Sequence, residues 1–491
     1  MHTLSRRALL GASAFGGLIP SLLLDSRRAD AATRIRYDLT TTEGQKNIKT
    51  YAKGFDLIGK LPERDPRGWL FQWYTHAVRS DRNKAGEISR VYGSASSPDK
   101  QLAQDTWNTC QPHNAPFSSD MFLPWHRMFV LCLEQIVRQL TKEDAFTLPY
   151  WNYTEAGQRA LPAEFRKQGD PTWGSLYRQN RITQVNAGTP IDQVPGSSPF
   201  DLSAMKFNVY SGGSGFCANL DNNPHGIVHD DIGNGQGMGS VPWAANDPIF
   251  WIHHCNIDHI WASWNKAGGK NPPLTGTFTF ADRDGKKVVL QVAKFLDTLT
   301  QGYEYDKYLP RPSGSLPFPP GNALVAAFAV HATSAQTSGP VSLGAAPVTV
   351  TLAAAPPAPG APAPASGNDA LTQSLQAVPA SRQFILQLND VKAMSRPGVN
   401  YDVYYGLAEG QTPSHDSPAY AGSLSFFGVA PHGDMGQMQM PGHNFSFLIT
   451  QPVRQALAGA ANAATKVTLV PTGAPASDSM PTIGSISLVS A

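Results

Sequence analysis

Histidines in the middle of the chain occur at spacings that suit metal binding. His225 and His229 are four residues apart, so on a helix their side chains lie on one face. His254 falls at 4-3-4-3 spacing in an apolar stripe that predicts an inward-facing helix, with Phe250, Ile257, Trp261 and Trp264. Asn223 and Gly233 are predicted to begin and end the helix of the first pair. Imidazoles directed into a core make a good metal site.

Three more histidines precede these. His76 shares a predicted helical stripe with Trp69 and Trp73. His126 opens a long amphipathic helix expected over about 122–140, and His113 lies in the loop before it. Six imidazoles without a carboxylate triad favour Cu, Zn, Ni or Fe. Two triads on facing helices suit two metal ions about 3.5–4 Å apart.

The first 31 of the 491 residues predict an export signal. Ser5-Arg6-Arg7 precedes an apolar run over 8–24, and Ala29-Asp30-Ala31 offers a cleavage site. The paired arginines favour the twin-arginine route to a periplasmic or secreted location, with an ordinary secretory signal as the alternative. No later stretch approaches the ~20 apolar residues of a membrane span. The net charge of +2 is carried by this leader, so no basic face predicts nucleic-acid binding.

The remaining chain predicts a mainly α catalytic domain followed by a C-terminal β-sandwich. The catalytic domain, an antiparallel helix bundle holding the metal site, is expected over 32–310. A connector with an Ala/Pro-rich segment follows over 311–367, and the sandwich occupies 368–491, or starts near 340. In the second case 348–352 is its first strand, and the Ala/Pro-rich run is an internal loop.

Two motifs in this chain resemble those of the type-3 copper polyphenol oxidases, the tyrosinases and catechol oxidases. The first is Phe122-Leu123-Pro124-Trp125-His126-Arg127 with Glu134. The second is His225-x-x-x-His229, then Asp247-Pro248-x-Phe250-x-x-His253-His254, then Asp258 and Trp261, with Asp258 among the candidate catalytic residues. The resemblance covers the chain from about residue 60 to its end.

This resemblance implies two copper ions, with dioxygen as co-substrate. By it, the first copper is bound by His76, His113 and His126, and the second by His225, His229 and His254. His253 is left to packing or a hydrogen bond. The thirteen positions from His113 to His126 exceed the usual nine of the family, which a loop insertion explains. In many relatives a cysteine is bonded to the middle histidine of the first site, so Cys110 is expected either as a thioether to His113 or as a free buried thiol.

The implied reaction is oxidation of o-diphenols to o-quinones, with weaker hydroxylation of monophenols. Relatives tie hydroxylation to an Asn that here is Gly226, which lacks a side-chain acceptor. Either Asp221 or Asp230 could act as a base or hold a water molecule. The alternative is that Asp221 is a charge at the helix start and Asp230 a solvated surface charge. Val241 occupies the position of a substrate gate, or is plain core.

The resemblance also implies that the sandwich covers the site, and that truncation near Gly367 raises activity. The loop 431–443 contains Met and His residues suited to Cu(I), although a simple hairpin loop is the alternative. An o-aminophenol oxidase, a dioxygen carrier and a dinuclear zinc hydrolase are the rival functions. Small phenols are the expected partners, and the sequence leaves open whether the chain forms a homo-oligomer.

Overall fold

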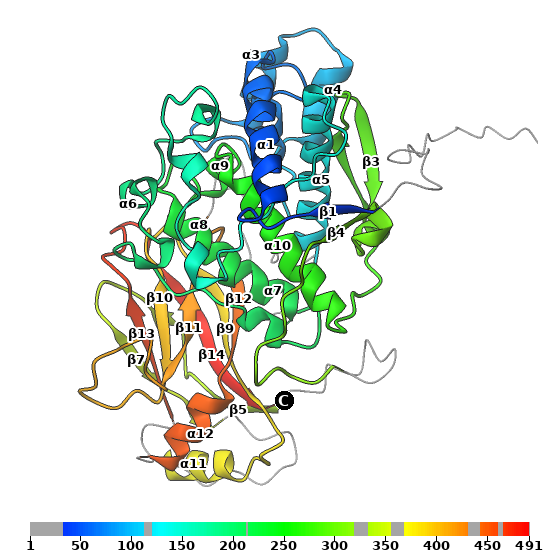
Figure 1. Ribbon diagram of the computed structural model, residues 1–491. Helices are drawn as coiled ribbons and strands as arrows, with labels where there is room; N and C mark the ends of the chain where they lie inside the picture. Colours follow the sequence, from blue (N-terminus) through cyan, green and yellow to red (C-terminus); the bar gives the residue numbers. More distant parts are fainter. Residues whose placement is uncertain are drawn as a thin grey trace, which may run out of the picture. The chain divides into compact units, whose positions relative to one another are not determined.

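The computed structural model describes residues 33–111, 120–212, 215–318, 332–354, 368–430, 442–459 and 465–490 (Figure 1). The predicted export signal, His113 and most of the Ala/Pro-rich and Met/His-rich loops lie outside these ranges. Residues from 33 onward form one unit. Among the described helices, none combines the length and apolar character needed to cross a membrane.

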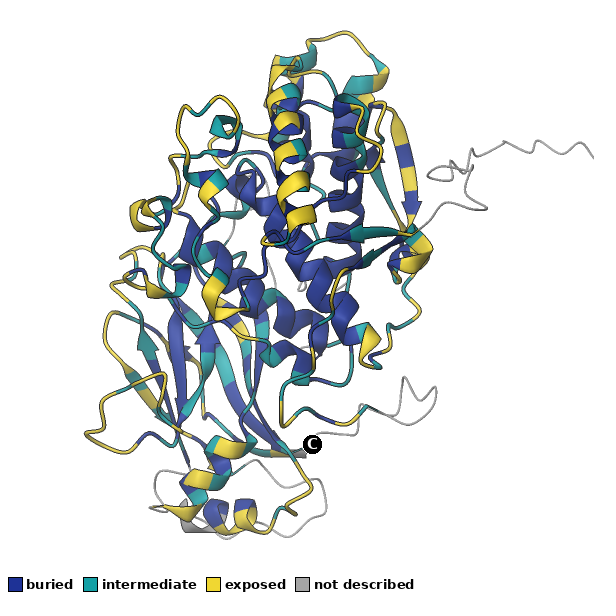
Figure 2. Ribbon diagram, in the orientation of Figure 1, coloured by how far each residue is buried: buried dark blue, intermediate teal, exposed yellow. Residues whose placement is uncertain are grey.

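Four helices build the frame of the first part: α1 (Thr42–Lys60), α2 (Trp69–His76), α5 (Phe122–Thr141) and α10 (Ile249–Lys266). The Thr41 hydroxyl caps α1 by accepting from the Gly44 amide. Helix α5 packs against both α1 and α10. Figure 2 shows α5 and α10 buried along most of their length, whereas α1 exposes one face. The helices that carry His126 and His254 therefore lie in the interior.

Shorter helices connect this frame. They are α3 (Lys84–Tyr92), α4 (Pro98–Thr106), α6 (Thr183–Ala187), α7 (Phe216–Leu220), α8 (Ile227–Ile232) and α9 (Val241–Ala244). The stretch 153–215 contains mainly 3-10 turns and loops, as its polar composition predicts. Two small sheets complete this part. Strand β1 (Arg34–Arg36) pairs in parallel with β4 (Tyr303–Tyr305), and β2 (Thr277–Ala281) pairs antiparallel with β3 (Lys287–Gln291).

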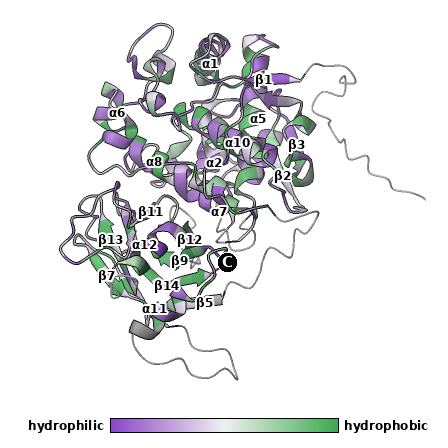
Figure 3. Cartoon of the chain, turned by 60° about the horizontal axis from the view of Figure 1, so that its bottom comes forward, coloured by the Kyte–Doolittle hydropathy of each residue, from purple (hydrophilic) through white to green (hydrophobic). Residues whose placement is uncertain are grey.

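The C-terminal part is a sandwich of two sheets. One sheet has the order β11 (Tyr420–Leu424), β10 (Tyr401–Tyr405), β13 (Lys466–Pro471) and β7 (Val348–Thr351). The other has the order β12 (His443–Leu448), β9 (Phe384–Lys392), β14 (Thr482–Ser490), β5 (Ala332–Gln336) and β8 (Ala353–Ala354), with β6 (Val341–Ser342) also on β14. Figure 3 shows hydrophobic residues, in green, along the strands of the sandwich. Side chains from both sheets share one core, among them Leu386, Val403, Leu469 and Ile486.

Of the two expected starts of the sandwich, 368 and near 340, the strands agree with the earlier one, because β5 begins at Ala332 and β7 at Val348. Strands β5 and β7 pair with β14 and β13, so residues before the Ala/Pro-rich run already belong to both sheets. That run is an insertion between β8 and α11 (Asn368–Gln376), and the connector is shorter than predicted. Helices α11 and α12 (Thr450–Ala458) were not expected.

Candidate metal centre

Helix α10 carries His254 into the interior. The Asp247 carboxylate accepts from the Ile249 amide at 3.1 Å and stabilises the first turn, as the Asp-Pro start predicts. Arg181 holds that carboxylate through two bonds of 2.6 and 2.7 Å. His254 itself is 1% exposed. Its position is therefore fixed by a helix anchored at its N-terminal end.

His225 and His229 come from a less regular segment than predicted. A π-helical turn (Asp221–Gly226) precedes α8, and Asn223 within it has extended backbone angles, φ −135° and ψ 120°. Asn223 is thus a break inside the segment and not a simple cap. Gly233 ends α8 as predicted. The two rings still lie close together, edge to face, with centroids 4.6 Å apart.

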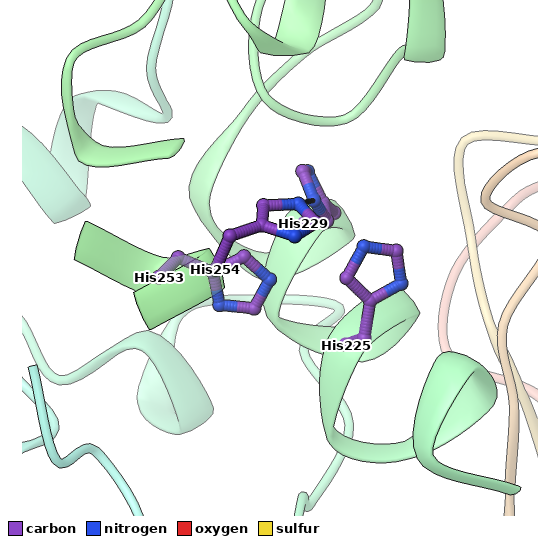
Figure 4. Close-up of side chains that lie close together, drawn as sticks. All are labelled: His225, His229, His253 and His254. Carbon is purple, nitrogen blue, oxygen red and sulfur yellow. Dashed lines mark hydrogen bonds between the residues drawn. The ribbon is translucent and has the colours of Figure 1, made fainter. Parts of the chain in front are cut away.

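Four imidazoles converge on the second half of the centre. His225, His229, His253 and His254 each offer a ring nitrogen, and these atoms all lie within 4.8 Å of one another (Figure 4). The Nε2 atoms of His229 and His254 are 3.4 Å apart. Both ring nitrogens of His253 lack a hydrogen-bond partner among the described residues. His253 was expected to pack or hydrogen-bond, and its ring stacks on that of His225 at 5.4 Å.

The first half of the centre is described in part. His76 ends α2, His126 lies in the first turn of α5, and both group with Cys110 within 4.8 Å. The Cys110 sulfur lies 3.6 Å from His126 Nε2. Because His113 lies outside the described residues, the predicted third ligand and the Cys110–His113 thioether stay predictions.

The two halves meet where α5 faces α10. The rings of His126 and His254 stack with centroids 4.4 Å apart and planes 12° apart. His126 belongs to the first group and His254 to the second, so the two groups form one continuous centre. This is the arrangement that a two-metal site requires.

Backbone carbonyls fix the tautomer of four of these rings. His76 Nδ1 lies 3.1 Å from the Val241 carbonyl oxygen, and His126 Nδ1 lies 2.8 Å from that of Phe122. His225 Nδ1 lies 3.1 Å from the Asp221 carbonyl oxygen, and His229 Nδ1 lies 2.8 Å from that of Met238. A carbonyl only accepts, so Nδ1 carries the proton and Nε2 presents its lone pair. Such outer partners are typical of metal-binding histidines.

Burial keeps the imidazoles of His126, His229 and His254 neutral. Desolvation, and then the neighbouring His225, lower the pKa of His126 to about 3. Burial likewise lowers the pKa of His229 and of His254 well below the ordinary value, and adjacent imidazoles add to the effect. A neutral imidazole is the form that binds metal. His254 Nδ1 is also buried without a partner among the described residues. These residues fit a pair of copper ions.

The candidate carboxylates lie in three different settings. Asp221 approaches His225 Nδ1 with its Oδ1 at 2.6 Å, so it orients that ring. Asp230 is not the solvated surface charge that was one alternative, because it accepts from Arg396 at 3.0 Å and from Ser425 at 2.8 Å. Burial raises the pKa of Asp230. Asp258 contacts Arg127 and not the ligand nitrogens.

Gly226 and Val241 both lie against the sandwich. A methyl group built on Gly226 would lie 2.6 Å from the Ser425 hydroxyl oxygen, so a side chain at this position requires Ser425 to shift. A Val241 methyl group faces Gly428, and the Val241 carbonyl holds His76. Val241 therefore serves the centre through its backbone.

The loop after β11 supplies residues that sequence reasoning missed. The Phe427 ring stacks on His229 at 4.0 Å and 10°, and meets His225 edge-on at 5.5 Å. Asn222, in the π-helical turn, donates to Ser423 O and accepts from the Ser425 amide, both at 3.1 Å. Ser425 also accepts from the Phe427 amide at 3.0 Å. No local motif marks these residues, because their partners are about two hundred positions away.

Comparison with known proteins agrees with this geometry. The family model described as the common central domain of tyrosinase matches residues 66–205 and 178–267, and a domain of unknown function matches 331–491. A tyrosinase of Hahella sp. is 30% identical over 323 residues, which cover 59% of this chain and 66% of that protein. Polyphenol oxidase II of Ipomoea batatas is 26% identical over 53% of this chain and 47% of its own length. The chain thus spans about half to two thirds of the length of these curated relatives.

Solved structures show the same fold. Latent apple tyrosinase matches 94% of this chain and 98% of its own, with a TM-score of 0.62 and 21% identity. A latent aurone synthase gives a TM-score of 0.62 at 19% identity, covering 94% of this chain and 90% of its own. These matches extend over the helical part and the sandwich together.

The two facing groups of buried histidines define the class, a protein with a dinuclear type-3 copper centre. Within that class, the chain belongs to the tyrosinase and polyphenol oxidase family. The predicted family, fold class and dicopper cofactor are confirmed.

Proposed function

We propose that this protein oxidises o-diphenols to o-quinones with dioxygen, and hydroxylates monophenols more slowly. The observation that carries the proposal is the stack of His126 on His254, which joins two groups of buried histidines into one centre. A bound copper pair supplies the electron transfer between the phenol and dioxygen. His76 and His126, with His113 expected, hold the first ion. His225, His229 and His254 hold the second.

The surroundings of His225 support the preference for diphenols. Hydroxylation requires a monophenol to lose its proton, which calls for an acceptor beside the second ion. Gly226 provides none, Asp221 is engaged with His225, and Asp230 is engaged with Arg396 and Ser425. Oxidation of an o-diphenol releases two protons and two electrons but inserts no oxygen into the ring, so it does not require the hydroxylation step.

We further propose that the sandwich keeps the site closed. Phe427 lies on the His229 ring, where an aromatic substrate would approach the second half of the centre. Two solved structures with this fold, apple tyrosinase and aurone synthase, are described as latent. The expected truncation near Gly367 would cut through both sheets, because β5 to β8 precede it. Cleavage between 318 and 332 is the better way to release the cover.

We also propose that the protein is exported to the periplasm or the medium by the twin-arginine leader over 1–31. This route carries folded, cofactor-loaded proteins. Sequencing the N-terminus of the protein from a producing cell tests it. A mature chain beginning near residue 32 in the periplasm or medium is the expected result, and an intact leader on cytoplasmic protein would contradict it.

Turnover assays with three substrate types test the main proposal. Copper-loaded protein should convert catechol to quinone faster than it converts 4-methylphenol, and faster than it oxidises o-aminophenol. Reversible dioxygen binding without catechol turnover would instead identify a dioxygen carrier. Faster oxidation of o-aminophenol would identify an aminophenol oxidase.

A further inference from the structure

An ion pair lies one step beyond the ligands at the contact of α5 with α10. Arg127 directly follows His126 on α5, and Asp258 lies one turn after His254 on α10. Arg127 Nε donates to Asp258 Oδ1 at 2.5 Å. The helices therefore touch twice in succession, through the stacked imidazoles and through this pair. One ligand of each half of the centre is adjacent to a member of the pair.

The pair is buried and held from several sides. Arg127 is 1% exposed and Asp258 4%. The Arg127 guanidinium lies 3.6 Å from the centre of the Trp261 ring and donates to Phe295 O at 3.0 Å. The second Asp258 oxygen accepts from the hydroxyls of Tyr303 and Tyr305, both at 2.6 Å. Neither side chain can change direction without losing these bonds.

Strand β1 also takes part in this anchoring. Arg36 donates to Asp258 at 3.1 Å and to Glu134 of α5 at 2.9 Å. Burial would raise the pKa of Asp258, but Arg127 and Arg36 outweigh it and lower that pKa, so Asp258 is a carboxylate. Apolar contacts resist sliding weakly because they have no direction, whereas charged hydrogen bonds fix distance and angle.

We propose that Arg127 and Asp258 are a positioning pair that sets the separation between the two halves of the metal centre. The inference rests on the proposed function, since it concerns two coupled copper ions. Coupled two-metal centres depend on ligands held within about 0.5 Å of their working geometry. The pair does not touch substrate or metal. It acts through the placement of His126 and His254.

The test measures magnetic coupling in the full-length, copper-loaded protein, because two Cu(II) ions at the correct spacing cancel each other's paramagnetism. Asp258→Asn and Arg127→Lys each weaken the pair while keeping a polar side chain. Glu134→Gln is the matched control. Glu134 is equally buried and bonded to Arg36, but it lies two turns from His126. Copper content by elemental analysis accompanies spin counting by EPR.

Both pair variants are expected to retain two copper ions per chain while the EPR-visible fraction of that copper rises several-fold. Glu134→Gln is expected to stay EPR-silent like the wild type. An equal rise in Glu134→Gln, or silence in both pair variants, would overturn the inference. If Asp258→Asn does not fold, Arg127→Lys alone decides. A wild type without two coupled ions would instead refute the proposed function.

Discussion

The Phe427 ring lies parallel to the imidazole of His229, with centroids 4.0 Å apart and planes 10° apart. One residue belongs to the loop after β11 of the sandwich and the other to α8 of the helical part. The sandwich therefore contacts a predicted copper ligand directly. This relationship makes the cover testable by single substitutions.

Phe427→Ala should raise the rate of catechol oxidation. A stacked aromatic pair contributes about 0.5–1.5 kcal/mol, so its loss should increase the open population by up to about tenfold. Initial rates at low catechol concentration measure the effect. Phe278→Ala is the control, because Phe278 is a half-buried aromatic on the β2–β3 hairpin. Equal rates for wild type and Phe427→Ala would show that Phe427 does not help to close the site.

Asn222→Ala should also open the site, by a different contact. Its amide makes two hydrogen bonds to the backbone of Ser423 and Ser425, each contributing about 1 kcal/mol. We expect catechol oxidation to increase several-fold with copper content unchanged. Asn219→Ala is the matched control, because the Asn219 amide donates within its own helix, to Gly215 O. An increase in the control as large as in Asn222→Ala would count against the docking role.

Gly226→Asn should have two separable effects. The new side chain collides with Ser425, and overpacking of this kind costs about 1–3 kcal/mol, so total activity should rise as the cover loosens. The added amide should also raise the ratio of monophenol hydroxylation to diphenol oxidation. Gly235→Asn is the control, since nothing lies within 4 Å of a methyl group built there. An unchanged ratio would show that Gly226 does not determine the preference for diphenols over monophenols.

Acid should destabilise the helical part through Glu134. Burial would raise the pKa of Glu134, but Arg36 and Arg138 outweigh it, and the pKa is lowered. A carboxyl with a lowered folded-state pKa contributes stability above its unfolded pKa, and that contribution is lost as the pH falls. The Tm of the wild type should be constant above about pH 5.5 and fall below about pH 4.5.

Glu134→Gln cannot titrate, so its Tm should fall less steeply over the same range. Glu63→Gln serves as the control, because Glu63 is 58% exposed in its pair with Arg90. Thermal unfolding followed by circular dichroism at several pH values measures both. Parallel Tm curves for wild type and Glu134→Gln would contradict the assignment.

The sequence predicted the ligand-bearing helices well because their signals are local. The stripes that contain His126 and His254 recur every three or four residues, and α5 lies within one residue of the expected bounds. The π-helical turn before α8 was missed, since Pro224 in a predicted first turn gives no sign of the break at Asn223. His113 lies outside the described residues, so its assignment still depends on the motif alone.

The sequence left two starts open for the sandwich, and it did not show strand β5 or the docking contacts. Strand β5 has the sequence Ala-Thr-Ser-Ala-Gln, which has little β-propensity and is held by pairing with β14. Asn222 and Ser423 are 201 positions apart, and neither is unusual in its own segment. Only the folded structure brings Ser425 against Gly226.

Copper content and EPR of the wild type together test the central claim most directly. The six predicted histidines, five of which the structure brings together, should hold two copper ions per chain whose Cu(II) form is EPR-silent. One copper per chain, or two with a full Cu(II) signal, would contradict a coupled pair held between His126 and His254.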